Sequence, residues 1–209
     1  MNTFVQRMRH AGQLRHLPAS LGIKMANRIL GTHLRLPSWP YPAVGAIEAL
    51  LQPDWRVLEF GSGWSTLWLA DRCAEVVSIE SSAVWAAFVE KKSETCGAAV
   101  QVINRDVEDY ADTSAFADAS FDLCIVDGLF RHSCFENALR VIRPGGYLYL
   151  DISEEPTDQL VYTSEDRRLL RQTVPRAARD TGGELRECRG LIVGQVFAGE
   201  GILMRKGDN

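Results

Sequence analysis

The sequence predicts a single α/β domain built on a doubly wound, mostly parallel sheet. Short apolar segments alternate with segments of helical periodicity along most of the chain, which is the pattern of strand–helix–strand units. The 209 residues, 46% of them hydrophobic, suit one globular domain with a sizeable core. Residues 1–40 lie outside this alternation. We expect them to form an N-terminal helical cap, and residues 41–209 to form the main domain.

The expected elements follow in order along residues 41–209. Residues 41–51 predict a helix with Pro42 near its first turn, where proline is tolerated. The expected strands are residues 56–60, 75–80, 98–104, 120–128, 147–151, 184–189 and 200–206. The expected helices between them are residues 64–72, 82–96, 132–142 and 164–180, with a weak helix or loop at 107–117.

Local signals set the ends of these helices. Gly97 closes the helix at 82–96, and the run from Arg143 to Gly146 closes the helix at 132–142. Thr163 and Asp166 predict a capping box for the last helix. Pro175 is expected to kink or split that helix, because proline removes a backbone donor.

Charge is distributed unevenly along the chain. Residues 1–47 contain six Lys/Arg and no Asp or Glu, whereas the remaining residues carry 17 basic and 27 acidic side chains. A basic arm of this kind suits contact with phosphates or an anionic membrane surface, or simply a helix lying on an acidic body. The acidic body disfavours a nucleic-acid partner.

The expected location is the cytoplasm. The five cysteines are odd in number and form no CxxC pair, which argues against a disulfide framework and a structural zinc. No apolar run reaches the roughly 18 residues that a membrane span needs. The start of the chain lacks a continuous apolar segment of the secretory type, although its arginines and lack of acids leave a mitochondrial transit peptide as an alternative.

Acidic residues stand at the ends of the predicted strands. They are Glu59, Glu80, Asp106, Asp127 and Asp151. Because the carboxyl ends of parallel strands share one edge of the sheet, where ligands bind in this fold class, we expect these acids to gather there. The alternative is that they only cap helices or satisfy loop amides.

The segment from Arg56 to Ala70 combines a strand, a glycine turn and a helix, the usual cradle of a nucleotide-type ligand. A dinucleotide fingerprint needs a small residue at its sixth position, for close packing of helix on strand. Counted from Gly61, that position holds the bulkier Thr66. Glu59, just before the turn, favours a cationic ligand over a pyrophosphate. We expect Gly61 to lack a side chain so that the ligand can approach the backbone.

The pattern Glu59-x-Gly61-x-Gly63-x-Ser65 resembles motif I of the class I S-adenosylmethionine-dependent methyltransferases, with Ser65 in place of the usual third glycine. The Pro-Gly-Gly segment before residues 147–151 and the closing strand pair resemble the same superfamily. The resemblance covers residues 41–206. It implies a Rossmann-like, seven-stranded methyltransferase sheet with an antiparallel last strand.

The resemblance also implies S-adenosylmethionine as cofactor and indicates which residues would hold it. Glu80 matches the acid that grips the ribose hydroxyls, and Asp106 matches the carboxylate that accepts from the adenine amino group. The full set of expected cofactor-binding residues is Glu59, Gly61, Ser62, Gly63, Ser65, Thr66, Glu80, Ser81, Asp106, Val107, Asp127 and Gly128.

Asp127-Gly128, Arg131 and Cys134 resemble the Asp-Gly-x-x-Arg-x-x-Cys pattern of a poorly characterised subgroup of these enzymes. The expected catalytic residues are Asp127, Arg131 and His132. Arg131 stands one helical turn after Asp127, where it is expected to pair with that carboxylate or clamp an anionic substrate group. A purely structural Asp–Arg pair and a solvated His132 are the alternatives, and Asp151 is a further candidate base.

A metal-assisted route is the remaining chemical alternative. Asp127 and Asp151 match two metal-binding positions of catechol O-methyltransferase-like enzymes, but Ile152 replaces the third ligand and Phe130 replaces the lysine base. Two carboxylates make a poor octahedral site, so we expect no metal.

Aromatic residues flank these motifs. Trp39 and Tyr41 are expected either to line the acceptor site or to staple the first helix to the body, and Trp64 to shield the ligand from water. Trp85 and Phe88 share a helical face and are expected in the core.

Methyl transfer to a small-molecule or sugar-like acceptor, at oxygen or nitrogen, is therefore the expected function. The alternatives are an NAD-dependent oxidoreductase on the same sheet, disfavoured by Glu59 and Thr66, and a non-catalytic S-adenosylmethionine-binding protein.

Overall fold

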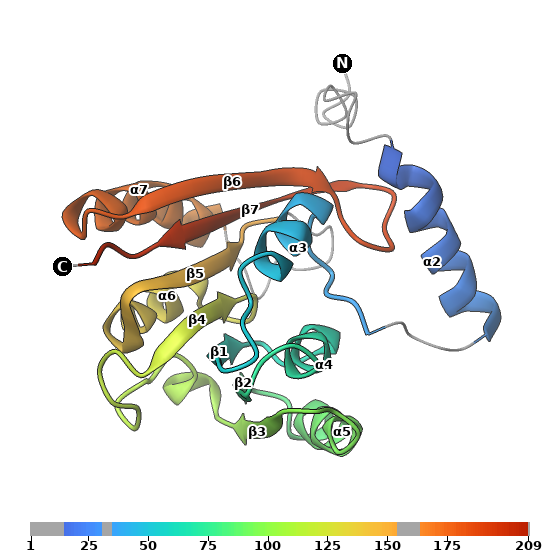
Figure 1. The fold of residues 1–209 in the computed structure, drawn as a ribbon, viewed down its shortest axis with the longest axis horizontal. Coiled ribbons are helices and arrows are strands. Elements are labelled where there is room, and N and C mark those ends of the chain that lie inside the picture. Colours follow the sequence, from blue (N-terminus) through green and yellow to red (C-terminus); the bar gives the residue numbers. More distant parts are fainter. Residues whose placement is uncertain (1–14, 31–34, 154–163, 209) are drawn as a thin grey trace.

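The computed structural model describes residues 15–30, 35–153 and 164–208, which form one seven-stranded sheet flanked by helices (Figure 1). The strands are β1 (Arg56–Phe60), β2 (Glu75–Glu80), β3 (Ala99–Asn104), β4 (Phe121–Val126), β5 (Ile142–Asp151), β6 (Glu184–Leu191) and β7 (Ala198–Arg205). The helices are α2 (Leu17–Leu30), α3 (Tyr41–Glu48), α4 (Trp64–Ala70), α5 (Ala83–Ser93), α6 (Arg131–Val141) and α7 (Ser164–Asp180), with a short 3-10 turn, η2, at Val107–Asp109.

The sheet has the order β3-β2-β1-β4-β5-β7-β6. Strands β1 to β5 are parallel, and β7 runs antiparallel to both of its neighbours, β5 and β6. This confirms the predicted doubly wound, mostly parallel seven-stranded sheet with an antiparallel last strand. Because the chain turns from β1 outward in both directions, the switch point lies between β1 and β4, where ligands bind in such sheets.

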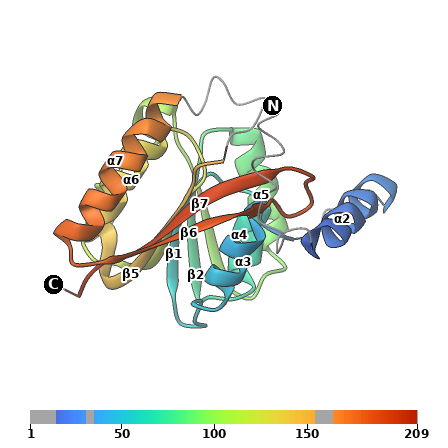
Figure 2. The same ribbon diagram turned by 90° about the horizontal axis from the view of Figure 1, so that it is seen from above.

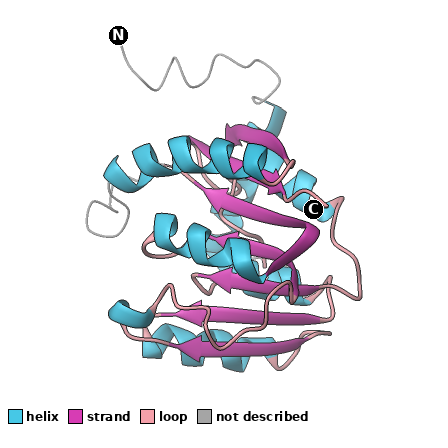
Figure 3. Ribbon diagram, turned by 90° about the vertical axis from the view of Figure 1, so that its left-hand side faces the viewer, coloured by secondary structure: helices cyan, strands magenta, loops and turns pink. Residues whose placement is uncertain are grey.

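Helices cover both faces of the sheet (Figures 2 and 3). Helices α6 and α7 lie on one face, and α3, α4 and α5 lie on the other. Burial on both faces explains why β1 and β4 are nearly continuous apolar runs rather than alternating ones.

Two local expectations differ from the structure. Strand β5 begins at Ile142, so the turn expected at residues 143–146 lies inside the strand, where its pairing with β4 shifts in register. Helix α7 continues through Pro175 without splitting. The segment 107–117, expected to be a weak helix or loop, contains the η2 turn and is otherwise loop. Thr163, expected to cap α7, lies outside the described residues.

The predicted N-terminal cap contains helix α2, which stands beside the body near the β6–β7 connection (Figure 1). Ser20 is fully buried and contacts the carbonyl of Ile192 and the hydroxyl of Tyr41, both at 3.3 Å. The ring of His16 stacks on Tyr41. Trp39 is buried in the same core cluster as α3 and α4, so packing of the main body reaches into residues 1–40. None of the described helices has the length and apolarity to cross a membrane.

The ends of β1 and β4 touch through two glycines. Gly61 has φ +97°, a conformation that side chains disfavour, and a Cβ added there would lie 2.8 Å from the Cα of Gly128. A Cβ on Gly128 would in turn collide with the hydroxyl of Tyr110. The fold itself therefore requires glycine at position 61, and the expected approach of a ligand to its backbone stays a prediction.

We predict that Gly61→Ala lowers the free energy of unfolding by roughly 1–3 kcal/mol, because the new methyl group strains the backbone and displaces Gly128. Gly97→Ala is the control, since nothing lies within 4 Å of the position of its added Cβ. Denaturant unfolding of both variants measures the difference. Equal stabilities would show that the two strand ends separate without cost.

Candidate active site

A cavity of about 330 Å³ lies at the carboxyl ends of β1, β2 and β4. Its lining comes from the glycine turn, from the residues after β2 and β4, and from the segment before α3. The residues are Ser38, Gly61, Ser62, Gly63, Trp64, Ser65, Glu80, Ser81, Trp85, Tyr110, Asp127, Gly128, Leu129 and Arg131. The structure thus brings together, in one cavity, most of the residues expected to bind a cofactor and two of the three expected to be catalytic.

Ser62, in the middle of the turn, makes hydrogen bonds through its backbone N–H, its hydroxyl and its carbonyl. Its backbone N–H donates to the Glu80 carboxylate at 3.1 Å, and its hydroxyl shares a 2.8 Å hydrogen bond with that of Ser78. Its carbonyl accepts from the indole N–H of Trp85 at 2.7 Å. The turn is therefore preorganised by side chains from β2 and α5 before any ligand arrives.

Glu80 lies at the end of β2 with its carboxylate on the cavity wall. Besides Ser62, it accepts from the backbone N–H of Ser82 at 2.8 Å and from the hydroxyl of Ser81 at 3.4 Å. These bonds fix the rotamer of an acceptor that can take a further hydrogen bond, because an ionised carboxylate offers about four lone-pair sites.

Gly63, the second glycine of the turn, differs from Gly61. Its backbone is extended at φ −178°, and the nearest atom to an added Cβ is the Ser65 hydroxyl at 3.7 Å. The protein itself therefore has room for a side chain at this position. Since Gly63 lines the cavity, a Cβ there would instead occupy ligand space.

Glu59 lies beneath the turn rather than facing the ligand. It is fully buried and accepts hydrogen bonds from the hydroxyls of Ser65 at 2.6 Å, Ser78 at 2.9 Å, and Thr66. Burial raises the pKa of Glu59 to about 7, although the three hydroxyls favour its ionised form. The structure gives this acid the task of anchoring the turn and the start of α4, whereas we had expected it to meet a cationic ligand.

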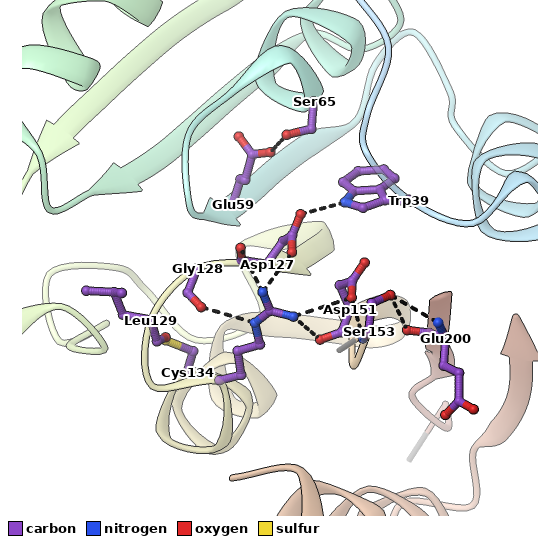
Figure 4. Close-up of polar contacts among 11 residues, drawn as sticks. Trp39, Glu59, Ser65, Asp127, Gly128, Leu129, Cys134, Asp151, Ser153 and Glu200 are labelled. Carbon is purple, nitrogen blue, oxygen red and sulfur yellow. Dashed lines mark hydrogen bonds and ion pairs between the residues drawn. The ribbon is translucent and has the colours of Figure 1, made fainter. Parts of the chain in front are cut away.

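Asp127, Arg131 and Asp151 form a buried charged cluster at the ends of β4 and β5 (Figure 4). The guanidinium of Arg131 lies 3.1 Å from Asp127 Oδ1 and 3.4 Å from Asp151 Oδ1. It also donates to the backbone carbonyls of Gly128, at 3.1 Å, and of Asp151. The predicted Asp127–Arg131 pair is confirmed, and Asp151 joins it.

Each carboxylate of the cluster has a second donor. Asp127 Oδ2 accepts from the indole N–H of the fully buried Trp39 at 2.8 Å, and Asp151 Oδ1 accepts from the backbone N–H of Ser153 at 2.7 Å. Burial and the charge of Asp151 nevertheless raise the pKa of Asp127 to about 7, against the lowering effect of Arg131. Burial likewise raises the pKa of Asp151. One guanidinium does not offset the desolvation of two carboxylates.

Five of the expected site residues lie outside this cavity lining. They are Glu59, Thr66, Asp106, Val107 and His132. Thr66 accepts from the backbone N–H of Gly63 at 2.8 Å, and so supports the turn indirectly. Asp106 precedes η2, and Val107 is half exposed. His132 lies 3.6 Å from Glu136 on α6.

Some functional residues were not expected from the sequence. Trp85, expected in the core, is 36% exposed, lines the cavity and braces Ser62. Tyr110, Ser38 and Leu129 also line it, and no local motif marks them. The sequence predicts that Trp39 lines the acceptor site or fixes the first helix to the body. In the structure Trp39 is buried and its indole donates to Asp127, while the ring of Tyr41 stacks on His16.

The donor set does not fit a divalent metal. Among the described residues there is no group of three or more His, Cys, Asp or Glu side chains arranged to hold one. The two carboxylates that resemble metal ligands, Asp127 and Asp151, already share the guanidinium of Arg131.

Glu59 generates a prediction about pH and stability. Because the pKa of Glu59 is higher in the folded protein than in the unfolded chain, its contribution to stability is lost as pH rises from about 4.5 to about 7. Glu59→Gln removes this titration. We predict that the free energy of unfolding of Glu59→Gln rises relative to that of the native protein between pH 5 and pH 8, by up to about 3 kcal/mol. Denaturant unfolding across this range measures the difference, and a constant difference would contradict the prediction.

Comparison with known proteins supports the assignment of the fold. Residues 58–150 match the family model described as a methyltransferase domain. The chain matches none of the curated proteins with which it was compared.

Several solved structures share the fold over nearly the whole chain. The O-methyltransferase TomG from Streptomyces achromogenes, solved with SAM and involved in tomaymycin synthesis, has a TM-score of 0.63 at 19% identity, covering 99% of this chain and 100% of that one. A putative O-methyltransferase from Klebsiella pneumoniae has a TM-score of 0.63 at 18% identity, covering 97% and 99%. An O-methyltransferase from Bacillus cereus, solved with SAH, has a TM-score of 0.61 at 21% identity, covering 92% and 91%.

The sequence match and the sheet topology agree. Residues 58–150 match a methyltransferase domain, and the chain shares its fold with solved O-methyltransferases.

Proposed function

We propose that the protein transfers the methyl group of S-adenosylmethionine to an oxygen or nitrogen atom of a small-molecule acceptor, with a sugar-like molecule as one candidate. The observation that carries this proposal is that one cavity joins two sets of groups. The glycine turn, Glu80 and Ser81 line it together with Asp127 and Arg131. A donor-binding surface and a buried acid–base cluster are therefore in reach of the same bound molecules.

The residues present fit the donor. Gly63 leaves space that a Cβ would fill, Glu80 offers a fixed acceptor for ribose hydroxyls, and Ser81 follows it on the wall. When bound, S-adenosylmethionine supplies an electrophilic methyl group beside a sulfonium leaving group, which needs no protonation. The protein's part is then to orient the acceptor and to exclude water.

Asp127 is the group we assign to the acceptor's proton. A quarter of its side-chain surface is exposed, and it lines the cavity. A carboxylate whose pKa is raised toward neutrality is a better general base than an ordinary aspartate. Trp39 and Arg131 each bind one of its oxygens and so fix its rotamer.

The charge of the cavity favours this function over an NAD-dependent oxidoreductase. Glu80 and Asp127 are acidic groups on the wall, and Arg131 is the cationic group among the described lining residues. Arg131 is already engaged by two carboxylates, so a pyrophosphate would meet repulsion from Glu80 with little compensation. A cationic donor meets complementary charge instead.

Two measurements test the proposal. Calorimetry with S-adenosylmethionine, S-adenosylhomocysteine and NAD should show binding of the first two ligands and none of NAD. Incubation of the protein with a metabolite extract and S-adenosylmethionine carrying a labelled methyl group should then transfer label to a small molecule. Binding without transfer to any acceptor would favour a non-catalytic binding protein, and selective binding of NAD would overturn the proposal.

Gly63 provides a separate prediction. Gly63→Ala should fold with native stability, because its backbone is extended and the added Cβ has room. It should weaken S-adenosylhomocysteine binding by at least about tenfold, because the methyl group intrudes on ligand space, as overpacking costs typically 1–3 kcal/mol. Gly97→Ala, where the added Cβ meets nothing, should leave affinity unchanged. Native affinity in Gly63→Ala would place the donor elsewhere.

Asp127 provides the catalytic prediction. Asp127→Asn keeps the side-chain shape and removes the base, so methyl transfer should fall by about 10²–10⁴-fold while affinity for S-adenosylhomocysteine changes little. Asp54→Asn, on an exposed residue before β1, is the matched control. Equal losses of binding and turnover in Asp127→Asn would show that this residue only holds the donor.

A further inference from the structure

The Asp127–Arg131–Asp151 cluster has one positive group for two negative ones. Arg131 faces both carboxylates, and two further donors to them, the Trp39 indole and the Ser153 amide, are neutral. All three charged residues are largely buried, with side-chain exposures of 25%, 9% and 4% for Asp127, Arg131 and Asp151. A buried excess of negative charge is costly, so the ligand-free site needs either a proton or a second cation.

Among the described residues, Arg131 is the cation that pairs with Asp127 and Asp151. Glu59 on β1 is a further acid near Asp127, and the hydroxyl of Tyr149 on β5 has no hydrogen-bond partner. Beyond β5, Ser153 contacts the backbone of Glu200, whose carboxylate pairs with Arg171 and Arg189 away from the cluster. On α6, His132 pairs with Glu136.

The cluster borders the cavity through Asp127 and Arg131, whereas Asp151 is not among the lining residues. Of the two acids, Asp127 is therefore the one that a cation in the cavity meets. The proposed cofactor, S-adenosylmethionine, is such a cation, because its sulfur carries a positive charge before methyl transfer and none afterwards.

We propose that Asp127 and Asp151 share one proton in the ligand-free protein, and that binding of the cationic donor expels this proton to solvent whereas binding of the neutral-sulfur product does not. This inference rests on the proposed function. It makes the preference for S-adenosylmethionine over S-adenosylhomocysteine a property of the charged cluster, and makes that preference grow as pH rises. The enzyme would thereby favour donor over product without a separate contact to the methyl group.

The direction in which Kd changes with pH follows from the linkage between proton binding and ligand binding. Where the free site is protonated, a ligand that binds the deprotonated form must displace the proton, so its Kd falls by up to about tenfold for each unit of pH increase. Above the pKa of the pair, no proton remains to be displaced and the Kd becomes constant. A ligand whose sulfur is neutral gains nothing from the second carboxylate charge, so its Kd follows no such slope.

Isothermal titration calorimetry from about pH 5.5 to about pH 8 tests the proposal with both ligands. At the acidic end we expect donor binding to release close to one proton, measured from the heats in two buffers of different ionisation enthalpy, while product binding releases little. The ratio of product Kd to donor Kd should rise by about tenfold or more over the range. Comparing both ligands in the same variants cancels any titration of their shared amino-acid group.

Asp127→Asn is the decisive variant, because it keeps shape and removes one carboxylate. It should bind both ligands with a Kd ratio that no longer depends on pH. Asp151→Asn should have the same effect, although Asp151 does not line the cavity. Asp54→Asn is the matched control and should retain the native pH dependence, since Asp54 is an exposed residue before β1.

Three outcomes would overturn the inference. Identical pH dependence for both ligands would show that the sulfur charge is not sensed by the cluster. A native pH dependence in Asp127→Asn would locate the titrating group elsewhere. Failure of both ligands to bind at any pH would overturn the proposed function and this inference together, whereas the first two outcomes leave the proposed function standing.

Discussion

A single guanidinium facing two buried carboxylates is the constraint on which the site depends. Arg131 ties the end of β4 to the end of β5 through side-chain and backbone contacts. Ser153 extends the connection to β7, through the backbone of Glu200, and Trp39 extends it to the segment before α3 (Figure 4). Parts of the chain that are distant in sequence therefore position one acid, Asp127, at the cavity wall.

The glycine turn on the cavity wall depends on a second buried acid, Glu59. Glu59 accepts from three hydroxyls that come from α4 and β2, and so fixes the turn between β1 and α4 from below. Glu80 and Trp85 hydrogen-bond to the backbone of Ser62, and Gly61 packs against the backbone of Gly128. The two acids differ in place, since Glu59 supports the turn from within the fold and Asp127 lines the cavity.

The sheet could be predicted from the sequence because its physical signals are local. Strands β1 and β4 are buried on both faces and so read as apolar runs, and the glycines after them mark the switch point. Asp127, directly after β4, and Arg131, the first residue of α6, could be paired because they carry opposite charges only four positions apart. The start of β5 was missed because Pro-Gly-Gly normally signals a turn, whereas here it lies in a stretch where the pairing shifts.

The rest of the site depends on contacts that no local pattern encodes. Glu59 lies in a motif position that suggests ligand contact, yet its orientation is set by hydroxyls on two other elements. Trp85 sits at the spacing of a core residue, but the position of α5 beside the turn brings its indole to Ser62. Tyr110 reaches the cavity from beyond β3, with nothing in its neighbourhood to mark it. The raised pKa of Asp127 arises from its burial and from the charge of Asp151, which lies 24 positions along the chain.

The most direct test of the central claim is ¹³C NMR titration of the aspartate side-chain carboxyls in the ligand-free protein, with Asp127→Asn and Asp151→Asn used to assign the signals. We predict that the Asp127–Asp151 pair loses its last proton near neutral pH, far above the ordinary aspartate pKa of about 3.9. Removing either carboxylate should return the pKa of the other toward that ordinary value. If both carboxyls titrate in the ordinary acidic range, then Arg131 is sufficient to neutralise the cluster, and Asp127 and Asp151 share no proton near neutral pH.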